Sequence, residues 1–216
     1  MKSIGNIYLT WRKGKGERRI SIGVIKRNKS LGTRFHYLKE GVKEANKFGF
    51  SIYEGFPDIS TTYSNNVIEI FGQRIMRSER NDIKDFYDFW LIDKAHLNDV
   101  YYMLAHTQGI LPTDNYEFLA EFNSSKDLKF ITEISGLSKY KISSDILKKG
   151  DVLSYKKEPC NSYDKYAVKV FKDELCLGYI KIIHNRIFHR SNKVFKISVQ
   201  HIEKNGLLKR VFLKVE

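Results

Sequence analysis

The sequence predicts an α+β protein, with a β-hairpin and helices followed by a small β module in the last third of the chain. Three patterns predict this class. Apolar residues alternate with polar ones along residues 4–27, recur at helical spacing between residues 37 and 104, and alternate again from residue 152 onwards. The short polar segment 123–127 separates the second pattern from the third, so we expect two coupled domains, residues 1–123 and 124–216.

The first domain is expected to open with a hairpin whose turn, Lys13 to Gly16, is rich in lysine and glycine. Leu38, Val42 and Ala45 then predict a short amphipathic helix that ends at Gly49. Residues 66–70 are expected to form a short strand.

Helices are expected again in the middle of the chain. Residues 85–91 and 100–104 carry aromatic and aliphatic side chains at helical spacing. Acidic residues lie between these rings and would repel a phosphate backbone, which favours a core role for the rings. Thr113 to Asn115 are expected to cap one more turn, which would run through Glu121.

Three strands are predicted in the carboxy-terminal module. The first runs from Val152 to Lys157 and ends near Pro159, which cannot donate to a β-ladder. The other two cover residues 167–171 and 176–183, where Gly178 marks a bulge or a close backbone approach.

A polar turn joins the first two of these strands. Asn161, Ser162 and Asp164 can each bond nearby backbone groups, with Tyr163 projecting from the middle of the turn. Two interpretations are open. Tyr163 and Asp164 contact a ligand, or Asp164 only caps backbone amides while Tyr163 packs on the module.

Charge is unevenly distributed along the chain. Residues 1–34 carry a net charge of +9, residues 35–123 carry −6 and residues 124–216 carry +10, which gives +13 in total. Clustered positive charge raises the local concentration of a polyanion, so nucleic acid is the expected partner. The alternative is that the lysines only decorate solvated surfaces.

The remaining composition indicates a globular, cytoplasmic protein. The apolar runs are far shorter than the roughly 20 residues that span a bilayer. Met1 to Ile4 lead into a polar, strand-like segment without the apolar core or the cleavage site of a secretory signal. Cys160 and Cys176 are expected to be ordinary thiols.

The carboxy-terminal motifs resemble those of the HIRAN family. The similar elements are Gly136-Leu137, Gly150-Asp151, the run Asn161 to Val170, and Leu177-Gly178-Tyr179, in the family's order and spacing. The resemblance covers residues 128–216 and implies a small OB-like β-barrel that binds single-stranded DNA or DNA ends. Two departures, Ser138-Lys139 and Tyr179, put capture of a 3′ end in doubt.

The resemblance and the lysine distribution together nominate the binding residues. The nominated residues are Lys139, Tyr140, Lys141, Lys157, Asn161, Tyr163, Asp164, Tyr179, Lys181 and Arg186. Lys156 is expected to be an additional phosphate contact.

Residues 1–123 also resemble the amino-terminal subdomain of HipA-type toxin kinases, through Ile22-Gly23-Val24, Arg34 to Leu38, Phe48-Gly49-Phe50 and Pro57. The kinase's catalytic motifs are not present in the sequence. This resemblance implies an alternative function: a protein-interaction regulator that docks on a kinase or another effector through residues 1–123.

Catalysis is not expected. The six histidines form no His-Glu-x-x-His pair, and no acidic triplet has the spacing of a nuclease site. We therefore expect no catalytic residues, no metal and no cofactor, and the leading hypothesis is an accessory protein that binds nucleic acid.

Overall fold

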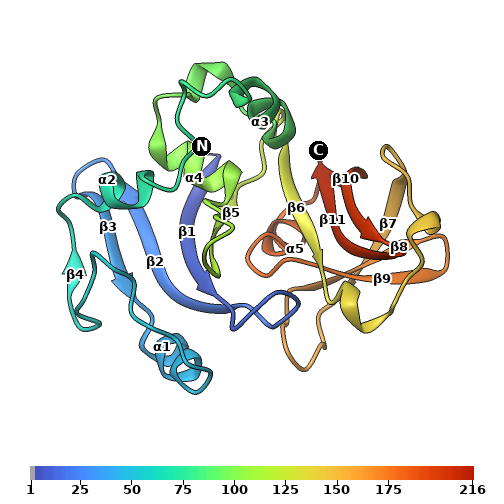
Figure 1. Cartoon of the computed structure of the whole chain (residues 1–216), viewed down its shortest axis with the longest axis horizontal. Helices are drawn as coiled ribbons and strands as arrows, with labels where there is room; N and C mark the ends of the chain where they lie inside the picture. The colour runs from blue at the N-terminus through green and yellow to red at the C-terminus, as the bar shows by residue number, and fades with distance from the viewer. Residues whose placement is uncertain (1–2) are drawn as a thin grey trace. The chain divides into compact units, whose positions relative to one another are not determined.

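The computed structural model describes residues 3–216, which form two compact units, residues 3–121 and Phe122–Glu216. The first unit contains a five-stranded sheet with helices, and the second contains a closed β-barrel of six strands (Figure 1). The predicted fold class, α+β with a small carboxy-terminal β-barrel, is therefore confirmed.

The first unit is built on a sheet with the strand order β4-β3-β2-β1-β5. The predicted amino-terminal hairpin is present as the antiparallel pair β1 and β2. The elements are β1 (Ile4–Trp11), β2 (Ile20–Asn28), β3 (Gly32–Tyr37), α1 (Lys39–Asn46), β4 (Thr62–Tyr63), α2 (Val67–Gly72), α3 (Ile83–Trp90), η1 (Lys94–His96), α4 (Val100–Thr107) and β5 (Tyr116–Phe122).

Aromatic side chains fill the core between one face of this sheet and helix α2. Phe35 of β3 lies 5.1 Å from Phe71 of α2, measured between ring centroids, and Phe71 lies 4.9 Å from Phe118 of β5. All three side chains are fully buried. Their contacts fix α2 on the sheet, because buried aromatic surface dominates the energetics of a small core.

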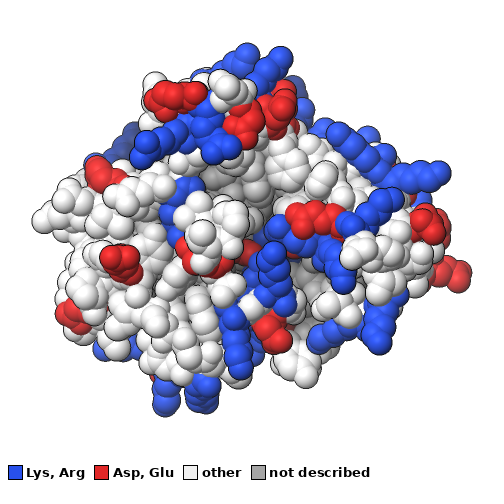
Figure 2. Space-filling model, viewed as in Figure 1, with Lys and Arg blue, Asp and Glu red and all other residues white. Residues whose placement is uncertain are grey.

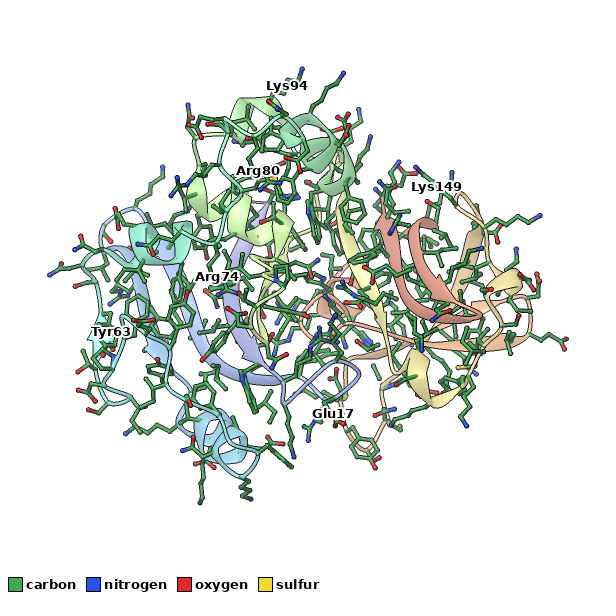
Figure 3. All side chains as sticks on the ribbon, in the orientation of Figure 1. Glu17, Tyr63, Arg74, Arg80, Lys94 and Lys149 are labelled. Atoms are coloured by element: carbon green, nitrogen blue, oxygen red, sulfur yellow. The ribbon has the colours of Figure 1, made fainter. Side chains whose placement is uncertain are left out.

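Arg74 is buried within this aromatic region (Figure 3). Its guanidinium binds both carboxylate oxygens of Asp114, at 2.6 and 2.8 Å, and its Nε donates to the Gly109 carbonyl. The guanidinium also lies over the rings of Tyr53, Tyr116 and Phe118. With its charge and its donors satisfied internally, Arg74 has a structural role.

Two predicted elements of the first unit were wrong. Residues 67–70 belong to helix α2, with Asn66 as its N-cap, because Val67 and Phe71 bury side chains four residues apart, which is a helical period. The turn expected through Glu121 is strand β5: Asp114 Oδ1 accepts a bond from the Tyr116 amide, and the chain then extends. Its contiguous burial is typical of a strand covered on both faces.

The second unit is the barrel, closed in the order β10-β11-β6-β9-β8-β7 with antiparallel pairing throughout. Its elements are β6 (Phe130–Ser135), η2 (Leu137–Lys139), η3 (Ser144–Ile146), β7 (Val152–Glu158), β8 (Ala167–Lys172), β9 (Leu175–Ile180), α5 (Arg186–Arg190), β10 (Ile197–Asn205) and β11 (Leu207–Val215). All three strands predicted for this module are present, although β9 ends three residues early.

Gly178 allows β9 to approach β6 closely. Its φ of +139° is rarely adopted by other residues, and a Cβ atom built there would lie 2.4 Å from the Ser135 carbonyl oxygen. The ladder between β8 and β9 shifts register at Val170 and Phe171, next to this glycine. The expected bulge and close approach at Gly178 are both confirmed.

Across residues 3–216, every helix is too short or too polar to cross a membrane.

Candidate nucleic-acid interface

The polar turn between β7 and β8 is ordered by its own side chains. Asn161 Oδ1 accepts hydrogen bonds from the amides of Tyr163 and Asp164, at 3.0 and 3.2 Å. Asp164 Oδ1 accepts one from the Tyr166 amide at 2.9 Å. These bonds define two successive Asx turns, as expected from the residue types.

Tyr163 projects from this ordered turn into solvent, with 83% of its surface exposed. The expectation that Tyr163 packs on the module is therefore wrong. Burying a tyrosine ring is normally favourable, so a rigid turn that holds it out in water gives up that stabilisation. Such a ring is free to stack on a planar ligand.

Asp164 is held from two sides. Its Oδ2 accepts a 2.6 Å hydrogen bond from Nδ2 of Asn185, a buried residue that precedes α5. With Oδ1 bonded to the Tyr166 amide, both carboxylate oxygens have internal donors. Asp164 thus anchors the turn to the barrel, as the capping interpretation predicts.

A row of outward side chains crosses the three strands beside the turn. The register pairs Lys156 of β7 with Lys169 of β8, and Lys169 with Tyr179 of β9. Side chains at directly opposed positions point to the same face of a sheet. Two lysines and one tyrosine therefore form a basic and aromatic row on the outside of the barrel.

Glu158 lies next to this row and binds two of its members, Lys169 and Tyr179, as well as Asn161 of the turn. Its carboxylate accepts hydrogen bonds from Lys169 Nζ at 2.7 Å, Asn161 Nδ2 at 3.1 Å and the Tyr179 hydroxyl at 3.1 Å. The bond from Lys169, followed by that from Asn161, holds the pKa of Glu158 below its usual range. The bond to Glu158 likewise raises the pKa of Lys169.

Lys157 does not belong to this row. It pairs with the buried Val168 and alternates with Lys156, so its side chain leaves β7 on the opposite face, where it is exposed. Strand parity thus separates two adjacent lysines that were both expected to contact phosphate.

The segment after β6 adds Lys139, Tyr140 and Lys141, all of which are exposed. It follows Ser135, which pairs with Tyr179, so the segment begins beside the basic and aromatic row. A hydrogen bond with Cys176 of β9 raises the pKa of Tyr140 to about 12. Cys160 and Cys176 are free thiols.

The expectation that Lys181 contacts phosphate is contradicted. Lys181 is fully buried, and its Nζ lies 2.9 Å from Glu133 Oε2. The strand ends at Ile180, so the outward alternation of β9 does not extend to this residue. A buried lysine is tolerated because a carboxylate pairs with it.

Arg186 belongs to a second group of side chains, around Tyr166. The guanidinium of Arg186 lies 5.8 Å from the centroid of the Tyr166 ring, and Lys165 Nζ lies 5.2 Å from it. The His189 ring meets the same tyrosine edge-on at 5.6 Å. Two cations and two rings therefore lie next to the turn that carries Tyr163.

Sequence reasoning missed five residues of this region: Glu158, Lys169, Tyr166, Asn185 and His189. Lys169 could have been found, because it alternates with Val168 and Val170 and must face outward if they face inward. The contacts of Asn185 and His189 depend on how α5 packs, which no local pattern indicates.

The fold and this surface define a class: an α+β protein whose barrel bears a basic and aromatic face. A scan against protein-family models and a search of curated proteins returned no match for the chain. Among solved structures, the chain is similar to the crystal structure of the HIRAN domain of human HLTF. That alignment has 17% sequence identity and a TM-score of 0.33, and it covers 40% of this chain and 74% of the other.

Proposed function

We propose that this chain is an accessory protein that binds single-stranded nucleic acid through its HIRAN-like barrel and has no catalytic activity of its own. The observation that carries the proposal is the position of Tyr163, an 83% exposed ring on a turn fixed by Asn161 and Asp164. The strands that flank this turn carry the row of Lys156, Lys169 and Tyr179.

Each part of the surface supplies one component of single-strand binding. An exposed aromatic ring can stack on any base, since every base has a π-face. Lysine side chains neutralise phosphates and release condensed counterions, which makes binding strongly dependent on salt. The proposed contacts are Tyr163, Tyr179 and Tyr140 for bases, and Lys139, Lys141, Lys156, Lys169 and Arg186 for phosphates.

The proposed orientation follows from the order of these groups. Tyr163 lies at the loop end of β7 and β8, whereas Lys156 and Lys169 lie further along the same strands. A strand that stacks a base on Tyr163 can therefore pass its phosphates along the lysines. Asp164 orients the turn in this scheme and does not contact the ligand.

The test is a fluorescence-anisotropy titration of the full chain with labelled single-stranded DNA and RNA, each with a free and a blocked 3′ end, at several salt concentrations. We expect an affinity in the micromolar range or tighter that falls linearly with the logarithm of salt. No binding at low salt would overturn the proposal. Equal affinity for blocked ends would remove end recognition only.

The Tyr163→Ala variant makes this test specific. Loss of one stacked base should weaken binding by about 1–3 kcal/mol, or roughly 5- to 150-fold. Phe48→Ala is the matched control, because Phe48 is also an exposed aromatic residue but lies outside the barrel. Equal effects of the two substitutions would contradict a stacking role for Tyr163.

A further inference from the structure

The amino-terminal sheet has a second charged surface, on strands β2 and β3. The register places Lys26 of β2 directly opposite Arg34 of β3. Lys26 is exposed and Arg34 is half-buried. Like charges at directly opposed positions destabilise a sheet, so this pair has a cost for folding.

No acidic side chain compensates for this repulsion. Within the described residues 3–216, neither Lys26 nor Arg34 takes part in an ion pair or a side-chain hydrogen bond. Several arginines of this unit are neutralised: Arg27 binds Asp99, Arg74 binds Asp114, and Arg19 binds Glu117. Other cations of the unit without an ion pair among the described residues, such as Lys43 and Lys94, lie on helices, whereas Lys26 and Arg34 oppose each other on paired strands.

Two rings occupy the adjacent row of the same face. Tyr8 of β1 pairs with Val24 of β2, and Val24 pairs with His36 of β3. Since Val24 and His36 are two residues from Lys26 and Arg34, these side chains share a face at a spacing of roughly 7 Å along the strands. Tyr8 and His36 lie on strands two apart, roughly 10 Å from each other.

The pKa of His36 depends on both cations. Burial, and then the charges of Lys26 and Arg34, lower the pKa of its imidazole from the ordinary value of 6.5. The ring is therefore neutral at pH 7 and presents a π-face rather than a third charge. The lowered pKa reflects the short distance between His36 and both cations that the strand register indicates.

We infer that this face, which consists of Tyr8, Lys26, Arg34 and His36, is a second contact for single-stranded nucleic acid, separate from the barrel. Two cations without acidic partners can bind phosphates, and the two rings beside them can stack on planar bases. A single-stranded nucleic acid presents both groups. An acidic peptide would satisfy the cations but would leave the rings without a role. The barrel surface and this face consist of different residues, so experiments can support or contradict binding at each one separately.

The test compares the full chain with a Lys26→Gln/Arg34→Gln variant. Two lost phosphate contacts should reduce the slope of log K against log salt by about 1.4 and weaken binding at low salt at least several-fold. Lys43→Gln/Lys47→Gln removes the same charge from exposed positions of α1 and the residue after it. That control should leave the slope unchanged. Because the substitutions at 26 and 34 remove a repulsion, the variant should melt no lower than the parent.

Photo-cross-linking with 5-iodouracil-substituted DNA identifies the surface that is used. The inference expects cross-links at Tyr8 or His36 in addition to those in the barrel. Cross-links in the barrel alone, with an unchanged slope in the variant, would overturn the inference and leave the proposed function intact. Cross-links at Tyr8 or His36 alone would support the inference and contradict binding through the barrel. Displacement of the DNA by polyglutamate as effectively as by unlabelled DNA would indicate an acidic protein partner and would also overturn it.

Discussion

At the scale of single residues, the lysines of the barrel surface attract a polyanion, but the carboxylate of Glu158 competes with it for Lys169. Lys169 lies in the centre of the basic and aromatic row, but Glu158 holds it at 2.7 Å. A phosphate that binds Lys169 must displace this carboxylate. Glu158 should therefore limit affinity while it orders the side chains of Asn161 and Tyr179.

The Glu158→Gln substitution tests this competition. The amide keeps the size of the side chain and can still accept hydrogen bonds, but it releases the charge of Lys169. We expect tighter binding of single-stranded DNA and a salt slope steeper by about 0.7, the value for one additional phosphate contact. Glu174→Gln, in the exposed turn between β8 and β9, removes the same charge. If both variants bind equally, only net charge matters and Glu158 is no competitor.

At the scale of elements, alternation predicted the strands that bury one face in the barrel, and local patterns failed where both faces are covered. Strands β7 and β8 were predicted within a residue or two, because their inward and outward side chains differ in character. Strand β5 was missed, because a segment buried on both sides has no alternation to detect. The short helix α2 was mistaken for a strand for a related reason, since five residues are compatible with either period.

The candidate site was predicted to a similar extent. The turn from Asn161 to Asp164 was recognised from residue types that form local hydrogen bonds. Lys181 was assigned wrongly, because its burial depends on Glu133, a residue 48 positions away that no local pattern connects to it. Contacts of this kind are set by the closure of the barrel and not by sequence spacing.

Closure of the barrel depends on Gly178 at the junction of β6 and β9. The Gly178→Ala substitution should destabilise the protein by about 2–4 kcal/mol, because a methyl group would clash with the Ser135 carbonyl and the backbone conformation would be strained. Gly14→Ala is the control, because a Cβ atom at that glycine has nothing within 4 Å. Urea unfolding of both variants measures the difference, and a neutral Gly178→Ala would contradict the close approach.

Helix α4 should make stability depend on pH. Its His106 stacks on Tyr102 at 4.2 Å, and burial, together with the nearby His96, lowers the pKa of His106 to about 4. Because this pKa is lower in the folded than in the unfolded state, the stabilisation is complete above about pH 6.5 and is lost as the pH falls towards 4. The loss should approach roughly 3 kcal/mol.

Unfolding measured between pH 7 and pH 4 checks this expectation with two variants. His106→Gln should flatten the pH dependence, whereas His201→Gln, at an exposed position, should leave it as in the parent protein. An identical dependence in the parent and in His106→Gln would show that other groups cause the loss.

At the scale of the whole molecule, charge follows the division into two units. The net charge of +10 in residues 124–216 belongs to the barrel, where Lys and Arg outnumber Asp and Glu on the face that Figure 2 shows. In residues 3–121, acids gather with basic side chains over α3 and the adjacent loops. Some acids of residues 35–123 form ion pairs within their own unit, such as Asp99 with Arg27 and Asp114 with Arg74. We therefore expect a polyanion to be attracted most strongly by the barrel unit, which carries the largest excess of positive charge.

Binding of single-stranded nucleic acid through the barrel surface is tested most directly by an NMR titration. The full, isotope-labelled chain is titrated with a short single-stranded oligonucleotide. Binding through the barrel surface predicts shifts of the amides of Tyr163, Lys169 and Tyr179 that saturate together and disappear at high salt. Val194 is as exposed as Tyr163 but lies in a different loop, and its amide should remain unperturbed. Saturating binding that leaves Tyr163 and Lys169 unshifted would contradict the account.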